Sequence, residues 1–174
     1  MEPVLIRRRL NELPAGRDAR ILSGLREAGV KGPLGEVART DAGKPYLPAR
    51  PEICFSVSHS GELWICAVCG VPVGVDLQRH TDCPRERIAR RFFHPDETAW
   101  LAERDFAPFF QVWAARESFV KCRGTGLFGE PAPFSVVREG RLAAPEGFRL
   151  SFPACEPGWS LALTVREERG EISE

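Results

Sequence analysis

The sequence predicts an α+β fold, in which short antiparallel strands and helices follow one another along one chain. Two observations predict it. Residues 53–77 contain short runs of apolar and small residues separated by turn-type residues, which is typical of antiparallel strands. Residues 85–122 carry helical patterns bounded by Pro or Gly. The 174 residues are enough for one domain or for two small lobes that share a core.

The first half of the chain is expected to contain mostly strands and turns. Residues 53–58 alternate apolar with small residues, as a half-buried strand does. The polar segment Ser58–Gly61 is expected to turn the chain back into another apolar run. A short helix ended by Gly29 and a loop rich in Gly and Pro precede these strands. The expected segments are strands 4–10, 53–58, 63–68 and 73–77, the helix 18–28 and the loop 40–51.

The second half is expected to be more helical, with strands returning at its end. Pro84 favours a first helical turn, with Asp82 or Cys83 as the N-cap of that helix. His94 is interpreted as a cap residue of the next helix, and Gly124 as part of the stop for a third. The expected segments are helices 85–93 and 109–122, a helix that starts at 94–97 and contains Trp100 and Leu101, and three antiparallel strands at 134–137, 147–152 and 159–165.

Composition gives no argument for a nucleic-acid or membrane partner. The 24 Lys and Arg residues equal the 24 Asp and Glu residues, so no net basic charge attracts an anionic polymer or surface. No stretch reaches the roughly 18 apolar residues that span a bilayer. At the N-terminus, apolar residues 4–6 precede basic residues 7–9, which is the reverse of a signal peptide. We therefore expect a cytoplasmic protein.

The six cysteines are expected to be mostly reduced in that compartment. Cys66 and Cys69 form a C-x-x-C pattern, but three residues along a strand place two side chains on opposite faces. The sequence has no second C-x-x-C and no His partner at zinc-ligand spacing. A metal or redox role is therefore not expected for this pair.

The segment 112–127 is the strongest candidate for a functional element. On a helix, Glu117 and Lys121 lie one turn apart on the same face, at the flank of an apolar arc. The pair is either an ordinary surface ion pair or two charges that a helix delivers to a site. Asp76 favours the second interpretation, because it ends the apolar run 63–75 where a strand should emerge into solvent.

Two further groups of polar residues leave alternatives open. His59, between two serines, is either a turn residue or a donor to an anion. Arginines lie on two predicted helices, and each basic face is either solvated or a contact for an anionic partner. These residues are Arg17, Arg20 and Arg26 around the first helix, and Arg85, Arg87, Arg90 and Arg91 on the second.

Five motifs together carry a resemblance to a known family. They are Gly43-Lys44-Pro45; Phe55-Ser-Val-Ser-His-Ser-Gly61; Gly74-Val-Asp-Leu-Gln78; Arg91-Phe-Phe-His-Pro-Asp-Glu97; and Trp113-Ala-Ala-Arg-Glu-Ser-Phe-Val-Lys121 followed by Gly124-Thr-Gly126-Leu127. In this order and spacing, the chain resembles the 4'-phosphopantetheinyl transferases of the surfactin-synthetase-activating type. The shorter holo-acyl-carrier-protein synthase type shares the helix motif but lacks the S-H-S segment found at 58–60.

The resemblance implies a fold and an activity. Members of this type have two pseudo-symmetric lobes, each a small, mostly antiparallel sheet packed on a long helix, with coenzyme A bound between them, and they act as monomers. The lobes would be residues 1–75 and 76–174 of one compact unit. The implied reaction is the transfer, dependent on Mg²⁺ or possible with Mn²⁺, of the 4'-phosphopantetheine arm of coenzyme A to a serine of an acyl, polyketide or peptidyl carrier protein.

The resemblance also implies roles for individual residues. Asp76 and Glu117 would bind the metal, with Gln78 as a weak or water-mediated ligand where the family usually has Glu. Glu117, Lys121 and His59 would be catalytic, with Glu117 as the general base and the other two on the pyrophosphate. Coenzyme contacts would come from Lys44, Ser58, His59, Asp76, Lys121 and Arg20, and carrier docking from Arg87 and Arg91. The missing acid at position 78 leaves one alternative, a non-catalytic module that binds coenzyme A or a nucleotide.

Overall fold

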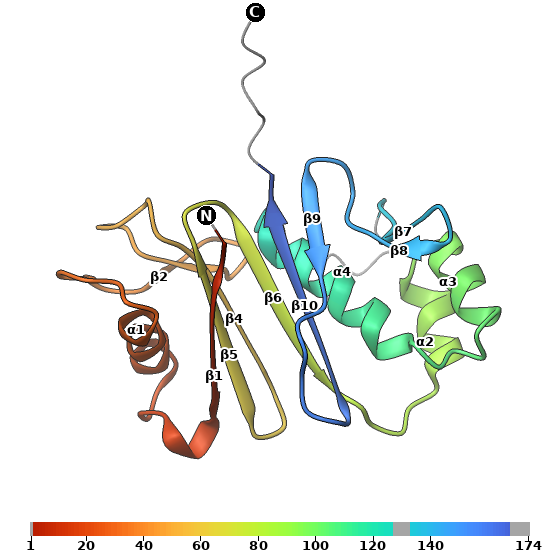
Figure 1. Cartoon of the computed structure of the whole chain (residues 1–174), viewed down its shortest axis with the longest axis horizontal. Helices are drawn as coiled ribbons and strands as arrows, with labels where there is room; N and C mark the ends of the chain where they lie inside the picture. The colour runs from red at the N-terminus through yellow and green to blue at the C-terminus, as the bar shows by residue number, and fades with distance from the viewer. Residues whose placement is uncertain (1, 127–132, 168–174) are drawn as a thin grey trace, which may run out of the picture.

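Two three-stranded antiparallel sheets form the centre of the protein (Figure 1). The structure is a computed structural model, and it describes residues 2–126 and 133–167. The strand order is β1-β5-β4 in the first sheet and β6-β10-β9 in the second. These strands are β1 (Val4–Arg9), β4 (Cys54–Ser60), β5 (Leu63–Cys69), β6 (Val73–Arg79), β9 (Phe148–Ser151) and β10 (Trp159–Arg166).

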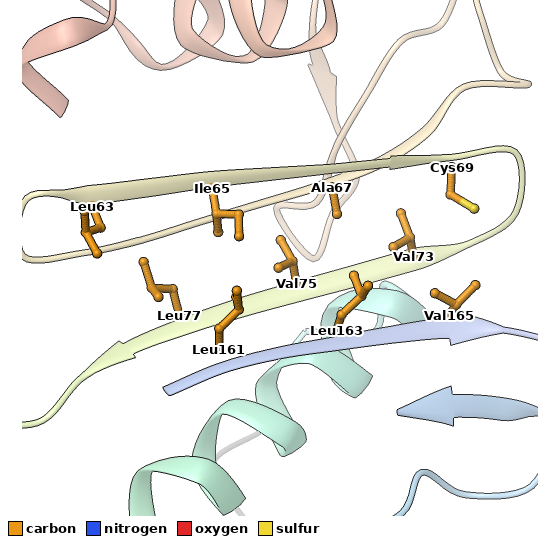
Figure 2. Close-up of a cluster of buried hydrophobic side chains, with 10 residues drawn as sticks. All are labelled: Leu63, Ile65, Ala67, Cys69, Val73, Val75, Leu77, Leu161, Leu163 and Val165. Atoms are coloured by element: carbon orange, nitrogen blue, oxygen red, sulfur yellow. The ribbon is translucent and has the colours of Figure 1, made fainter. Parts of the chain in front are cut away.

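Helices pack on both sheets, as the predicted α+β class requires. Helix α1 (Arg17–Glu27) lies beside the first sheet, and helix α4 (Phe109–Arg123) packs along the second (Figures 1 and 2). The other elements of the described residues are the 3₁₀ turn η1 (Leu10–Glu12), helices α2 (Arg85–Phe92) and α3 (Pro95–Ala102), the hairpin of β2 (Ala38–Arg39) with β3 (Pro45–Tyr46), and the hairpin of β7 (Val137–Arg138) with β8 (Arg141–Leu142).

Strand β5 is buried along its whole length because both of its faces contact apolar layers. Its even-numbered residues join α1 in one cluster, and its odd-numbered residues face the second sheet, as period-two alternation requires. Cys66 and Cys69 therefore lie on opposite faces, as predicted. Figure 2 shows the cluster between the sheets, formed by Leu63, Ile65, Ala67, Cys69, Val73, Val75, Leu77, Leu161, Leu163 and Val165.

Alternate serines of β4 join the two sheets at their edges. β4 and β6 are the terminal strands of their sheets, so each has one row of backbone groups without a ladder partner. Serine hydroxyls accept the β6 amides in place of backbone carbonyls: Ser56 from Val75 at 3.1 Å, Ser58 from Leu77 at 3.2 Å, and Ser60 from Arg79 at 2.9 Å. This serine seam sets the register of β6 against β4.

The serine seam also corrects a predicted turn. The segment Ser58–Gly61 was expected to leave the sheet, but β4 continues through Ser60 because its hydroxyls bond to β6. The loop expected at 40–51 contains strand β3 of a short hairpin. The lobe boundary expected after residue 75 falls inside β6, which belongs to the second sheet.

Two predictions for the second half are wrong in part. A strand was expected at 134–137, but only Val137 is in one, because the amide of Val136 bonds to a side chain instead of to another strand. Glu97 accepts the amide of Val136, and Ser135 accepts the amide of Val137. Helix α2 has Pro84 itself at the N-cap position and no side-chain cap, so neither Asp82 nor Cys83 serves that role.

Two helix ends agree with the sequence. His94 caps α3, since its ring accepts the amide of Asp96 and Glu97 reaches back to the amide of His94 at 2.9 Å. Gly124 ends α4 in the left-handed conformation, with φ at 72°.

Gly74 allows strand β6 to lie directly on helix α4. A Cβ at this position would lie 2.0 Å from the carbonyl oxygen of Ser118 and 2.3 Å from the amide nitrogen of Cys122, and backbone atoms cannot rotate away. We expect Gly74→Ala to lower the free energy of unfolding by about 2–3 kcal/mol, as overpacking does. Urea unfolding measures this change. Gly70→Ala is the matched control because a Cβ there meets nothing within 4 Å, and equal stability of the two variants would contradict the prediction.

Candidate active site

Asp76 is a buried acid whose two carboxylate oxygens are both engaged. It lies on β6, and the residue is 2% exposed. Its Oδ1 accepts the ammonium of Lys121 at 2.6 Å and the hydroxyl of Ser58 at 3.0 Å, and its Oδ2 accepts the amide of Gln78 at 2.7 Å. The charge-assisted bond from Lys121 is the strongest of the three in kind. These bonds fix the carboxylate between the serine seam and helix α4.

Lys121 bonds to Asp76 and not to Glu117. The interpretation of Glu117 and Lys121 as an ordinary surface ion pair is therefore wrong. Helix α4 is also buried around most of its circumference rather than along one arc, which is typical of a helix enclosed by other elements. Arg116, Glu117 and Lys121 consequently face protein atoms or a pocket, whereas Arg123, the last residue of the helix, is exposed.

Glu117 is a partly buried carboxylate beside Asp76. Its pKa is raised to about 7, first by burial and then by the negative charge of Asp76, whereas Lys121 and Arg116 oppose the shift. No residue described by the structure donates a hydrogen bond to this carboxylate. The two acids that the sequence singled out, 41 residues apart, are therefore close enough to affect each other's charge.

The raised pKa of Glu117 predicts a pH-dependent stability of the metal-free protein. The folded protein holds this proton more tightly than the unfolded chain, whose glutamate has an ordinary pKa of 4.5, so stability falls as pH rises from about 5 to about 7. The shift corresponds to at most about 3 kcal/mol. Urea unfolding at several pH values in a chelator would show this fall for the wild type and its absence in Glu117→Gln. Identical pH profiles would contradict the shift.

A basic pocket lies in front of these residues. It has a volume of about 700 Å³ and lies between α1, the β2–β3 hairpin, β4 and α4. Asp76 and Ser58 lie behind its wall. The titratable side chains that line it are Arg17, Arg20, Arg39, Lys44, His59, Glu117 and Lys121. Cationic groups outnumber the single carboxylate, so the pocket suits a ligand that carries several negative charges.

The residues that the resemblance assigns to the coenzyme do not all face the pocket. His59 faces the pocket, while its neighbour Ser58 faces the opposite side of β4. The Ser58 hydroxyl donates to Asp76 and accepts from Leu77 and Lys121, which uses its full bonding capacity. The ammonium of Lys44 is directed at backbone carbonyls, although its side chain lines the pocket.

The arginines of the N-terminal region separate into two groups. Arg17 and Arg20 line the pocket, whereas Arg26 donates to the carbonyls that follow α1 and is structural. Arg39 also lines the pocket and pairs with Asp18, but sequence reasoning missed it. It lies in a two-residue strand outside every quoted motif, so no sequence pattern marked it.

Comparison with known proteins relates part of this sequence to a family. Residues 72–154 match the family model described as the 4'-phosphopantetheinyl transferase superfamily. Over this segment, which is just under half of the chain, the protein is similar to that superfamily. The predicted resemblance is thereby confirmed, and the matched segment contains Asp76, Gln78, Glu117 and Lys121.

Individual 4'-phosphopantetheinyl transferases show the same relationship. A Bacillus subtilis enzyme of this name is 39% identical over 98 residues, which are 54% of this chain and 43% of the relative. One from Aneurinibacillus migulanus is 34% identical over 52% of this chain and 38% of the relative. A second B. subtilis protein of this name is 33% identical over 70% of this chain and 58% of the relative. The chain thus spans less than two thirds of each of these relatives.

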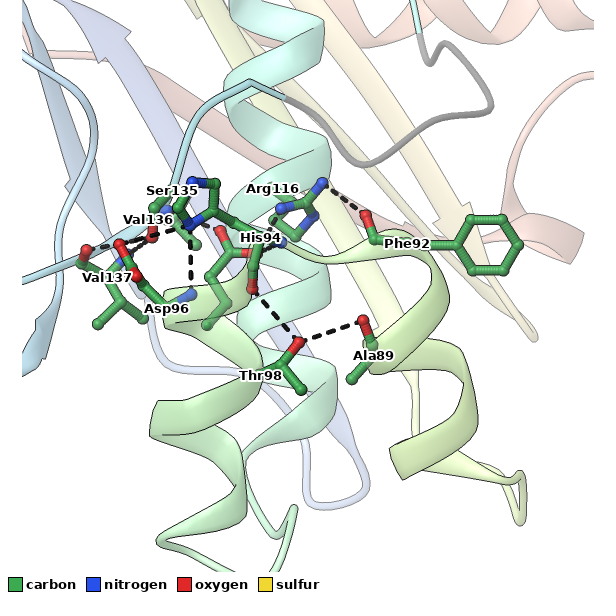
Figure 3. Close-up of polar contacts among 10 residues, drawn as sticks. Ala89, Phe92, His94, Asp96, Thr98, Arg116, Ser135, Val136 and Val137 are labelled. Carbon is green, nitrogen blue, oxygen red and sulfur yellow. Dashed lines mark hydrogen bonds and ion pairs between the residues drawn. The ribbon is translucent and has the colours of Figure 1, made fainter.

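A buried ion pair joins two of the motifs that carry the resemblance. Glu97 of α3 is fully buried and Arg116 of α4 is 5% exposed, and the two side chains bond directly. Figure 3 shows Arg116 in this network, bonded to the backbone of Phe92. Glu97 also accepts the amides of His94 and Val136, at 2.9 and 2.8 Å. The Arg116 guanidinium donates to the carbonyl of Phe92 at 3.1 Å. The bonds hold α4 at the residue that precedes Glu117.

Sequence reasoning quoted Glu97 and Arg116 within motifs but assigned them no role. The rings of Phe93 and Phe134 enclose the guanidinium at 4.9 and 5.1 Å. The only sequence signal is the spacing of Glu97 from His94, which predicts a capping box and not an ion pair. Burial of both charges depends on tertiary packing.

Helix α2 presents two arginines that form no ion pair with any residue the structure describes, and they lie beside an apolar side chain. Arg87 and Arg91 are exposed, whereas Arg90 pairs with Glu86 at 2.7 Å. Phe92 is 39% exposed, and its ring lies 5.1 Å from the Arg91 guanidinium. Within residues 2–126 and 133–167 no cluster of three His, Cys, Asp or Glu side chains could hold a metal. In the same ranges, no helix has the length and apolar character needed to cross a bilayer.

Proposed function

We propose that the protein transfers the 4'-phosphopantetheine arm of coenzyme A to a serine of an acyl, polyketide or peptidyl carrier protein. Similarity to the family supports the reaction class, because the relatives that the chain matches are named for this transfer. The observation that carries the proposal for this chain is the meeting of Asp76, Glu117 and Lys121 beside a basic pocket.

The two sheets are proposed to be the cores of two pseudo-symmetric lobes in one compact unit. Each sheet has a helix of its own, α1 on the first and α4 on the second. The turn between β5 and β6 is the natural boundary, a few residues before the one predicted after position 75. The pocket has walls from both sheets' layers, which supports a ligand site between the lobes.

The proposed chemistry is phosphoryl transfer. The carrier serine oxygen attacks the phosphorus that bears pantetheine, a new P–O bond forms, and the bond to the second phosphate breaks, which releases adenosine 3',5'-bisphosphate. Glu117 takes the hydroxyl proton, directly or through a water. Lys121 and His59 donate to the pyrophosphate oxygens, and Arg20 is available for a further phosphate of the coenzyme.

Asp76 and Glu117 are proposed to hold a Mg²⁺ or Mn²⁺ ion, with Gln78 contributing through water. The residues fit such an ion, because no described residue donates a hydrogen bond to the Glu117 carboxylate, which lies next to a second negative charge. Mg²⁺ commonly binds one or two carboxylates together with phosphate oxygens and waters. When bound, it would supply positive charge to the pyrophosphate. Asp76 is kept in place by Ser58 and Gln78.

Arg87 and Arg91 are proposed to dock the carrier protein. Both are free of acidic partners on α2, and exposed Phe92 adds an apolar contact beside them. An acidic carrier surface would complement this combination. We further propose that the protein acts as a monomer in the cytoplasm.

Carrier loading tests the proposal directly. The purified protein is incubated with an apo carrier of each of the three kinds, coenzyme A and Mg²⁺, and the intact mass of the carrier is measured. We expect at least one carrier to gain the mass of the phosphopantetheine arm. Gln78, in place of the usual acid, favours one alternative function, a non-catalytic coenzyme A module. Tight binding of coenzyme A without loading of any carrier would support that alternative.

A further inference from the structure

The ammonium of Lys44 donates all of its hydrogen bonds to backbone carbonyls of the protein. A lysine ammonium has three N–H groups. The Lys44 nitrogen lies 2.6 Å from the carbonyl oxygen of Lys121, 3.3 Å from that of Cys122 and 3.4 Å from that of Val73. The side chain is partly buried, and burial lowers its pKa. No N–H group is left over for a phosphate in this arrangement.

Two of these carbonyls belong to the last turn of α4. The final carbonyls of a helix have no amide partner within the helix and form the negative end of its dipole. The amide of Gly124 satisfies Val120, and Lys44 satisfies the next two residues along the chain. The third carbonyl is that of Val73, the first residue of strand β6. One side chain thus connects the β2–β3 hairpin with both elements that carry the site.

The backbone around Lys44 fits the same turn closely. A Cβ at Gly124 would lie 3.3 Å from the Cδ atom of Lys44, and a Cβ at Gly126 would lie 3.3 Å from the Cβ atom of Ala42. Both glycines have φ at 72°, which disfavours other residues. The Gly-Lys-Pro and Gly-Thr-Gly motifs, distant in the sequence, therefore form the two sides of one contact.

We propose that Lys44 is a positioning residue that acts through Lys121 and does not contact the coenzyme. The Lys44 ammonium donates to the backbone carbonyl of Lys121 and so fixes the last turn of α4. The side-chain ammonium of Lys121, in the same turn, lies 2.6 Å from Asp76. The importance of this arrangement for transfer rests on the proposed function. The arrangement itself is a property of the ligand-free protein and can be tested without any reaction.

Hydrogen–deuterium exchange of ligand-free Lys44→Met tests the proposal, since methionine keeps much of the apolar stem and lacks the donors. We expect the amides of the last turn of α4 to exchange about tenfold faster, because their helix end loses its cap, while helix α2 is unchanged. Lys31→Met, which removes an exposed ammonium, should leave both helices unchanged. In carrier loading, kcat should fall in Lys44→Met by a larger factor than KM for coenzyme A rises.

Unchanged exchange in the last turn of α4, together with weaker binding of coenzyme A by calorimetry, would show that Lys44 is a ligand contact and overturn the proposal. If Lys44→Met does not fold, Lys44→Leu replaces it, since leucine also lacks donors, and exchange at the wild-type rate in that variant would likewise overturn the proposal. Faster exchange in a protein that loads no carrier would support the positioning role and reject the proposed function. The experiments therefore distinguish failure of the positioning role of Lys44 from failure of the proposed function.

Discussion

Replacing Glu117 by glutamine is expected to lower kcat/KM for carrier loading by about a thousandfold, within the range that a general base contributes. The glutamine has nearly the same shape but accepts no proton and carries no charge for a cation. Asp76→Asn is expected to have a comparable effect, because it weakens the bond to Lys121 and removes the second charge. Intact mass spectrometry of the carrier over time measures both rates.

The matched control for these variants is Glu103→Gln, which removes an exposed carboxylate next to Arg104. It should load carriers at the wild-type rate. Gln78→Glu is expected to load at or above that rate, since it adds a third acid for the metal. Transfer by Glu117→Gln at a near-normal rate would reject its assignment as base and metal ligand. Thermal unfolding of each variant separates loss of chemistry from loss of folding.

Replacing Arg116 by methionine is expected to lower the free energy of unfolding by about 3–5 kcal/mol, the cost of leaving a buried charge without its partner. Glu97 would keep two amide donors but lose the guanidinium. The double variant Glu97→Gln, Arg116→Met should be more stable than the single Arg116 variant, because it removes the unpaired charge as well. Urea unfolding of the four proteins in this cycle gives the coupling.

Arg90→Met serves as the control for the buried pair. Arg90 and Glu86 are also an ion pair, but both side chains are mostly exposed, and such pairs contribute about 0–1 kcal/mol. Similar losses for Arg90→Met and Arg116→Met would contradict the claim that burial makes the difference. Because Arg116 precedes Glu117, we also expect carrier loading to fall more than the loss of folded protein explains.

The acids of the site could be predicted from local pattern, whereas their partners could not. Asp76 stands at the end of an apolar strand and Glu117 one turn before a lysine, and both features are visible in the sequence. That Lys121 bonds to Asp76 rather than Glu117 depends on how α4 crosses β6, which Gly74 controls through a contact invisible to pattern reasoning. The family resemblance identified the motifs, but not what their side chains touch.

Element types were predictable where periodicity was strong. The helices of the second half and the strands around β5 follow apolar patterns that their burial explains. The strand expected at 134–137 failed because Glu97, from a distant helix, occupies the amide of Val136. The pocket arginine at position 39 had no pattern at all, since a two-residue strand is too short to show one.

The serine seam affects how easily substitutions can change the contact between the two sheets. In an ordinary sheet, neighbouring strands are held by main-chain groups that no substitution except proline removes. Here a single serine hydroxyl makes each hydrogen bond between β4 and the amides of β6. Replacing one serine by alanine therefore removes one of these bonds and leaves the others. Substitutions can therefore change the number of bonds between the two sheets one at a time, while the backbone pairing within each sheet is kept.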